Sequence, residues 1–494
     1  MTRARLPLAA LLALAAVPAA ALADAPAPVL LEGFAAVQGL RIADADGDGI
    51  PDVMLVSGRD VRIFRGKKGG PVAASPSWSY RVPDAATFAW PGRVFGEPGA
   101  RVPSLLALAG ATALRLLPGK PPIAEEGLPA VPAWSDPAHA VLTDFVRGAH
   151  AFFPTETGYR WIPDWAGARD VGYDLLVEPR RKVVPAGPFL EEGATATAEW
   201  PTVTLVPSWP GAAGKPAAFV LTDDAVHAFV PTPSCVAEVR WGTSFLPSVG
   251  DGRMVLADLD GDGTPDLCHE ATTNETGAYT FFRIPLPPAP VAAPAARGKA
   301  IEGGEIRPPS SAIRLTGYQF PPDYVDLDGD GRLDMAVTTI EIDANNVVSA
   351  VFKGRVTAKT RAFLNRSKGG GSDLFPGTPD AEVDSPIGVR LRFTFAGAIE
   401  VKRSFTIIAT ADLDGDGKKD LVIRTASDTL SVHKGTASGV WEKEPAVVKI
   451  PAMGTSPDIE GYAADLTGDG KDDLVLLYKA APGGEDRVYV IVSP

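Results

Sequence analysis

The sequence contains few of the residues that usually carry catalysis or covalent cross-links, with two cysteines and five histidines in 494 residues. Two cysteines exclude a dense disulfide framework. No H-E-x-x-H motif, nucleophile elbow, phosphate-binding loop or dinucleotide fingerprint occurs. The sequence therefore shows no recognisable catalytic centre, although its many carboxylates leave open a pair suited to glycoside hydrolysis.

Long apolar runs are also missing, except at the N-terminus. Arg3 and Arg5 precede the apolar stretch Leu6–Ala21, and Ala21-Leu22-Ala23 fits a small-x-small cleavage site. We expect residues 1–23 to be a secretory signal peptide, and the chain to be secreted, periplasmic or on the cell surface. Residue 24 is Asp rather than Cys, so no lipid anchor is expected, and no later apolar run reaches the ~18 residues that span a bilayer.

Positive charge is in the minority, since 47 Lys and Arg face 60 Asp and Glu for a net charge of −13. This balance argues against nucleic acid as a partner.

Many of the acids belong to one nine-residue loop that occurs five times, beginning at Asp44, Asp258, Asp326, Asp412 and Asp465. Its glycines at the fourth and sixth positions permit the positive φ angles of a tight loop.

Oxygen ligands at positions 1, 3, 5 and 9 of the loop, with the main-chain carbonyl of position 7, are what Ca²⁺ prefers. The sequence therefore predicts about four to five bound Ca²⁺ ions, one in each loop. The candidate ligands are Asp44, Asp46, Asp48, Ile50 and Asp52; Asp258, Asp260, Asp262, Thr264 and Asp266; Asp326, Asp328, Asp330, Arg332 and Asp334; Asp412, Asp414, Asp416, Lys418 and Asp420; and Asp465, Thr467, Asp469, Lys471 and Asp473.

These loops are not EF-hands. An EF-hand requires an acid at position 12 and a helix on each side, whereas position 12 here is Leu55, His269, Val337, Ile423 or Leu476. From position 9 onward the residues are apolar and often β-branched, which favours a strand. Each loop is therefore expected to join two strands.

The spacing of the loops predicts an all-β propeller. Successive loops from Asp258 onward begin 68, 86 and 53 residues apart, and a period of this size built from short strands is typical of propeller blades. Three degraded loops are expected in the long interval before Asp258, at Phe95–Gly99, at Asp164–Gly167 and at Ser208–Ala217, with Asp144–Pro154 as an alternative to the second. The domain, residues 24–494, would have seven or eight blades.

The strand Val29–Leu31 is expected to complete the C-terminal blade and close the ring. Residues 335–411 predict an enlarged blade with strands in Val347–Leu364 and Val389–Thr410. Its basic residues form either a solvated face or a patch for an anionic partner. They are Lys353, Arg355, Lys359, Arg361, Arg366, Lys368, Arg390, Arg392, Lys402 and Arg403.

Two further features leave alternatives open. Cys235 and Cys268 favour a disulfide that closes a loop of about 33 residues, the alternative being two separate thiols.

Eight of the nine tryptophans lie in the first half of the chain, and Trp165 and Trp209 occupy loop position 2. They either pack the degraded loops in place of an ion or form a sugar- or protein-binding surface.

The Asp-x-Asp-Gly-Asp-Gly-x-x-Asp-Leu pattern resembles the FG-GAP/VCBS repeat, the unit of integrin α-subunit propellers and of many exported bacterial proteins. The resemblance covers residues 29–494, with specific motifs at the five loops. It implies Ca²⁺ on one face of a propeller. Thr467 in place of an Asp and the acid-poor region 95–210 depart from the pattern.

The sequence favours a monomeric binding or adhesion module for an extracellular protein or carbohydrate ligand. A propeller-type polysaccharide lyase or hydrolase and a purely structural envelope protein are the alternatives. Fold alone does not decide among them.

Overall fold

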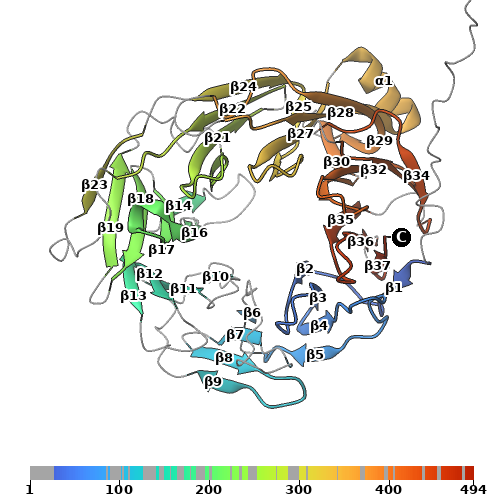
Figure 1. Ribbon diagram of the computed structural model, residues 1–494. Coiled ribbons are helices and arrows are strands. Elements are labelled where there is room, and N and C mark those ends of the chain that lie inside the picture. Colours follow the sequence, from blue (N-terminus) through green and yellow to red (C-terminus); the bar gives the residue numbers. More distant parts are fainter. Residues whose placement is uncertain are drawn as a thin grey trace, which may run out of the picture.

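Short antiparallel sheets follow one another along the chain and lie around a ring (Figure 1). The computed structural model describes residues 27–493 with gaps, the longest at 89–101, 126–140, 185–194, 243–252 and 288–299. The fold is all-β and propeller-like, apart from one short α-helix and one 3-10 turn among the described residues.

In the N-terminal half, most sheets consist of four strands that follow one another in the chain. One sheet contains β2 (Gly39–Ala43), β3 (Asp52–Ser57), β4 (Asp60–Phe64) and β5 (Trp78–Arg81); the next contains β6 (Thr87–Phe88), β7 (Leu105–Ala109), β8 (Thr112–Leu116) and β9 (Ile123–Glu125). Then come β10 (Val141–Thr143), β11 (His150–Thr155), β12 (Gly158–Ile162) and β13 (Tyr173–Leu176), and the separate pair β14 (Arg180–Val184) and β15 (Thr195–Glu199).

Two sheets follow in the middle of the chain. The first contains β16 (Val203–Trp209), β17 (Lys215–Leu221), β18 (Ala225–Pro231) and β19 (Val236–Gly242), with β23 (Ile301–Glu305) added parallel to β19. The second contains β20 (Arg253–Ala257), β21 (Asp266–Thr272), β22 (Thr276–Phe282) and β24 (Ser311–Thr316).

The C-terminal half contains a larger sheet and two four-stranded ones. The larger sheet is built from β25 (Tyr318–Gln319), β26 (Asp323–Val325), β27 (Asp334–Ile340), β28 (Arg355–Phe363), β29 (Ala381–Phe393) and β30 (Ile399–Arg403). The next contains β31 (Ile407–Ala411), β32 (Asp420–Ala426), β33 (Thr429–His433) and β34 (Ala446–Lys449); the last contains β35 (Asp458–Ala464), β36 (Asp473–Lys479), β37 (Arg487–Ile491) and β1 (Val29–Leu30).

The N-terminal strand completes the C-terminal sheet, as the sequence predicts. In β1, Val29 pairs with Val490 and Leu30 with Tyr489 of β37, and Figure 1 shows β1 beside β37. Leu31 is fully buried in an apolar cluster shared with Val488 and Val490. The two ends of the described chain are thus joined in one sheet, which covers an edge of β37 that would otherwise be open.

Shortening Leu31 tests how much this closure stabilises the fold. We expect Leu31→Ala to lower the free energy of unfolding by about 2–5 kcal/mol, because it leaves a cavity in the joint core. Leu30→Ala, at a position 44% exposed, should change it by no more than about 0.5 kcal/mol. Equal effects of the two variants in urea unfolding would contradict a buried joint.

The enlarged segment contains a helix where the sequence analysis expected a strand. Residues Ala344–Lys353 form α1, and only β28 that follows it is extended. The strand prediction from Val347 was wrong because it overlooked two end signals. Asp343 Oδ1 accepts the backbone N–H of Asn346 at 2.7 Å, as an N-cap does, and Gly354 follows the helix with a φ of 61°.

One degraded repeat was also placed wrongly. Tyr173–Leu176 is the outermost strand of its sheet, rather than a strand that follows an inner loop. The connection that corresponds to the acidic loops lies between β10 and β11, within the alternative segment Asp144–Pro154. Residues 144–149 themselves lie outside the described residues, as do 89–101 with Phe95 and 164–171 with Trp165.

The favoured disulfide is not formed, because Cys268 is a free and buried thiol. Its Sγ lies 3.0 Å from Tyr324 Oη, which donates to Glu270 Oε1 at 3.0 Å. Cys235 lies outside the described residues. Burial raises the pKa of the Cys268 thiol, which keeps it protonated and unreactive.

A reducing agent should therefore leave the stability of the protein unchanged. A native disulfide of this loop length would contribute about 3–4 kcal/mol. We expect thermal melts with and without dithiothreitol to coincide. A clear drop of the melting temperature on reduction would show that the cysteines are bonded in solution.

Candidate metal centres

Each acidic loop joins two neighbouring strands of a sheet, and its ninth residue is the first residue of the second strand. The strands β3, β21, β27, β32 and β36 begin at Asp52, Asp266, Asp334, Asp420 and Asp473. Both features agree with the sequence prediction. The backbone ladder of the strand thereby fixes the last acid of every loop.

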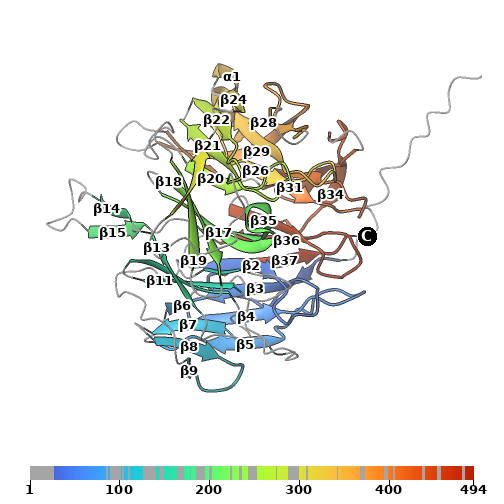
Figure 2. The same ribbon diagram turned by 60° about the vertical axis from the view of Figure 1, so that its left-hand side comes forward.

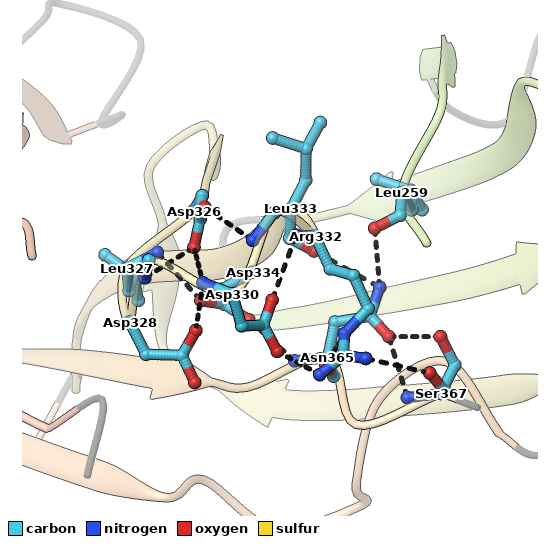
Figure 3. A network of polar contacts seen from close by, with 12 residues as sticks. Leu259, Asp326, Leu327, Asp328, Asp330, Arg332, Leu333, Asp334, Asn365 and Ser367 are labelled. Atoms are coloured by element: carbon cyan, nitrogen blue, oxygen red, sulfur yellow. Dashed lines mark hydrogen bonds and ion pairs between the residues drawn. The ribbon is translucent and has the colours of Figure 1, made fainter. Parts of the chain in front are cut away.

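The first aspartate organises the loop through backbone N–H groups. In the loop drawn in Figure 3, Asp326 Oδ1 accepts the N–H groups of Gly329 at 2.7 Å and Asp330 at 3.0 Å. Its Oδ2 accepts the N–H of Gly331 at 2.8 Å. The two glycines have φ angles of 79° and 87°, which a residue with a side chain rarely adopts.

The ninth aspartate is buried and closes the loop. Asp334 is 1% exposed; its Oδ2 accepts the N–H of Leu327 at 2.8 Å and its Oδ1 the N–H of Asn365 at 2.7 Å. Burial raises the pKa of Asp52 and of Asp334 to about 7, and that of Asp266 to about 8. The same cause raises the pKa of Asp420 and Asp473 to about 6. Without a cation, these carboxylates are costly to ionise.

In four of the loops, three carboxylate oxygens lie within 4.8 Å of one another. Asp334 belongs to such a group in the third loop, whereas the other three groups use positions 1, 3 and 5. The groups are Asp44, Asp46 and Asp48; Asp258, Asp260 and Asp262; Asp326, Asp328 and Asp334; and Asp412, Asp414 and Asp416. The loop from Asp465 to Asp473 forms no such group among the described residues, since Thr467 replaces the acid at position 3.

The donor sets fit a hard divalent cation. Asp258 Oδ1 is buried and accepts no hydrogen bond within the described part of the chain. Burial and the neighbouring acids raise the pKa of Asp46, Asp258, Asp260 and Asp328. Crowded carboxylates with raised pKa values are stabilised as anions by a bound cation, and an all-oxygen set selects Ca²⁺ over softer metals.

Side chains at position 7 turn away from the acids or pair with one of them. Arg332 Nε donates to the carbonyl of Asn365 at 2.9 Å, and its guanidinium also contacts Asp330. Lys418 Nζ donates to Asp416 at 2.8 Å. That the carbonyls of Ile50, Thr264, Arg332, Lys418 and Lys471 complete the metal sites remains a prediction.

Basic side chains just after the third strand of a sheet contact the loops, and the sequence analysis did not assign them this role. Arg65 lies 2.7 Å from both Asp46 and Asp48, Arg283 lies 3.0 Å from Asp260, and Lys434 lies 2.8 Å from Asp414. Two of these basic residues could have been found from the sequence, because each is followed by glycine, in Arg65-Gly66 and Lys434-Gly435. The backbone N–H groups of Gly66 and Gly435 donate to the ninth acids Asp52 and Asp420. These cations offset part of the loop charge.

Consecutive loops also contact one another. The backbone N–H of position 8 in one loop donates to a carbonyl at position 1 or 2 of the preceding loop, in the pairs Leu333 to Leu259 (2.9 Å), Lys419 to Leu327 (3.1 Å) and Asp472 to Asp412 (2.7 Å). Lys67, beyond the first loop, donates to Leu466 of the last loop at 2.9 Å. The four loops from Asp258 to Asp473 therefore form a continuous series of contacts, which the Lys67 bond extends to the first four-stranded sheet.

The degraded loop at Ser208 holds a packed tryptophan. Trp209 is fully buried, precedes the 3-10 turn Pro210–Ala212, and makes edge contacts with Phe219 and Trp241 at ring-centroid distances of 5.2 and 6.0 Å. This geometry favours the packing alternative over a binding surface at Trp209.

Three of the five basic residues of the enlarged segment whose side chains the structure describes form ion pairs; the side chains of Lys368, Arg390, Arg392, Lys402 and Arg403 lie outside the described residues. Lys359 lies 3.2 Å from Glu341, Arg361 lies 2.7 Å from Glu382, and Arg366 contacts Asp380 at 2.5 Å. These pairs favour a solvated, ion-paired face over a patch for an anionic partner.

Comparison with known proteins supports the repeat assignment. Residues 412–476 match the family model described as FG-GAP-like repeat, so this segment, with the fourth and fifth loops, is an FG-GAP-like repeat as the sequence predicts. No curated protein matches the chain. Among the described residues, no helix is long and apolar enough to cross a membrane.

Two solved structures are similar to this chain over most of their own length. One is BBS1N, from a crystal structure in complex with ARL6DN soaked with lead, with 10% identity and a TM-score of 0.37 over 95% of this chain and 98% of that chain. The other is an Agrocybe aegerita lectin described as recognising non-reducing terminal N-acetylglucosamine, with 13% identity and a TM-score of 0.37 over 79% and 92%.

Proposed function

We propose that the chain is an exported, calcium-stabilised propeller of eight blades that serves as a binding or adhesion module for an extracellular protein or carbohydrate. The observation that carries the proposal is the convergence of three carboxylates in each of four loops. The signal-peptide pattern of residues 1–23 supports export. The sheets that follow one another around the ring, with β1 completing the last, support eight blades.

Calcium has a structural role in this proposal. The ions would neutralise the crowded acids, and the chain of loop contacts would then hold neighbouring sheets in register. Extracellular calcium modules bind at roughly 10⁻⁴–10⁻³ M, which suits permanent occupancy outside the cell. The protein would bind its partner as a monomer and present a surface fixed by its metal sites.

Thermal unfolding of the mature protein tests the proposal. Calcium at 10 to 100 times the dissociation constant should stabilise the fold by about 1.4 to 2.7 kcal/mol per site, so several sites give a large rise in melting temperature over chelator. Magnesium, which requires a tighter octahedral set, should give much less. Identical melting in chelator, magnesium and calcium would overturn the calcium role.

The binding function needs a second measurement. In calcium, an array of glycans and extracellular proteins should yield a ligand that remains chemically unchanged. New reducing ends or unsaturated uronate absorbance during incubation with polysaccharides would instead show an enzyme. Empty arrays would favour a purely structural envelope protein.

A further inference from the structure

A cavity of about 660 Å³ opens between the inner strands of three consecutive sheets. Its walls come from β26, β31 and β35, and from β27 and β28 behind them. In Figure 1, β35 lies on the inner side of the ring, and Figure 2 shows β26, β31 and β35 in the same region. A second hollow of about 430 Å³ shares Asp323 and Tyr462 with it.

The cavity is negatively charged and contains no basic side chain in its described lining. Its two ionisable acids are Asp323 and Glu460, one from each side. Asp323 is open to the cavity, and its carboxylate has no hydrogen bond or ion pair within the described part of the chain. Asp323 is exposed, but the surrounding chain partly desolvates its carboxyl group and raises its pKa. Arg41 lines only the second hollow.

Glu460 is held in place by an aromatic neighbour. Tyr462 Oη donates to Glu460 Oε2 at 2.9 Å, which keeps a charged oxygen oriented at the cavity wall. The rings of Tyr462 and Phe320 give the lining its aromatic surface. A carboxylate beside an aromatic ring is suited to a ligand that has both an apolar face and polar hydrogens.

The inner wall of the cavity is rich in hydroxyl groups. Thr338 and Thr360 are buried, and their Oγ1 atoms lie 2.9 Å apart. Since only one of the two hydroxyls donates to the other, one O–H remains to donate to a ligand. Thr406 donates to the carbonyl of Ile459 at 2.6 Å and can still accept.

From this arrangement we propose that the cavity binds an amino sugar, with its ammonium group on Asp323 and Glu460 and its hydroxyls on the threonine wall. The inference rests on the proposed binding function and names the ligand class and the place. Two acids without a basic partner repel an anionic sugar and attract a cation. The hydroxylated inner wall favours a polyol over the methylene stem of a lysine side chain.

Calorimetry with a matched pair of sugars tests this inference on the calcium-loaded mature protein. The probes are the tetramer of glucosamine, in slightly acidic buffer where its amines are protonated, and the same tetramer fully N-acetylated. The charged tetramer should bind at one site per chain, and about tenfold or more tightly than the neutral one, a difference of ~1.4 kcal/mol. Added salt should weaken it.

Two variants locate the site. Asp323→Asn should reduce affinity for the charged tetramer about tenfold or more and reduce its advantage over the neutral tetramer. Asp373→Asn removes an exposed acid outside the cavity lining and should leave affinity unchanged. Equal binding of both sugars, no binding of the charged sugar, or an unaffected Asp323→Asn variant would overturn the inference.

Further outcomes separate this inference from the proposed function. A lysine peptide that binds more tightly than both sugars would replace the amino sugar by a protein ligand. If the sugars fail while the same sample still binds calcium and melts at the calcium-raised temperature, only the cavity assignment falls. If calcium has no effect, the failure lies with the proposed metal role.

Discussion

Replacing Asp412 by asparagine is expected to remove one calcium ion and to destabilise the calcium-loaded protein by about 2–4 kcal/mol. Asp412 Oδ1 accepts the N–H of Gly415 at 2.8 Å, and its Oδ2 accepts that of Gly417 at 2.9 Å. It also belongs to a carboxylate group with Asp414 and Asp416. One substitution therefore removes a ligand charge and weakens the hydrogen bonds that shape the loop.

The effect should depend on calcium. In chelator, Asp412→Asn also relieves repulsion among three crowded acids, so its destabilisation should shrink. Asp373→Asn, an exposed acid outside the loops, should alter stability by less than about 0.5 kcal/mol in either condition. Urea unfolding with and without calcium measures both differences. An equal loss of stability in both conditions would assign Asp412 a purely structural role.

Replacing Gly329 by alanine is expected to weaken calcium binding in two loops at once. Gly329 has a φ of 79°, and a Cβ there would lie 2.9 Å from the carbonyl oxygen of Gly417 in the next loop. The same close approach occurs between Gly261 and Gly331 and between Gly415 and Gly470, at 3.0 Å. An added methyl group must therefore push neighbouring loops apart.

Gly331→Ala is the matched control. Gly331 lies in the same loop with a φ of 87°, but a Cβ there meets no atom within 4 Å. Both variants should carry left-handed backbone strain of roughly 1–2 kcal/mol, whereas only Gly329→Ala should also lower the affinity of the Asp412 loop, by about fivefold or more. If calorimetry shows that each variant has a lower affinity for only one calcium ion, the loops bind calcium independently and the prediction is wrong.

The acidic loops and the strands that follow them could be predicted because their information is local. The Asp-Gly-Asp-Gly spacing fixes the turn, and the apolar residues after Asp420 or Asp473 continue as a strand. The pairing of β1 with β37 was also predictable, since the strand count left Val29–Leu31 without a sheet.

Other features depend on contacts that sequence spacing does not reveal. The helix α1 was missed because its apolar residues were interpreted as a strand, although Asp343 and Gly354 mark its ends. The contacts between loops and the cavity at Asp323 and Glu460 join residues from different sheets, which only the folded arrangement of the sheets brings together. Cys268 looked like half of a disulfide, yet its neighbour is Tyr324.

The stoichiometry of calcium binding tests the central claim most directly. Calorimetric titration of the mature, calcium-free protein should show about four to five ions per chain, with affinities in the range of extracellular modules. Asp412→Asn should bind one ion fewer than the parent protein. Absence of binding heat, together with unchanged melting in calcium, would mean that the five loops are turns without ions and would contradict the account.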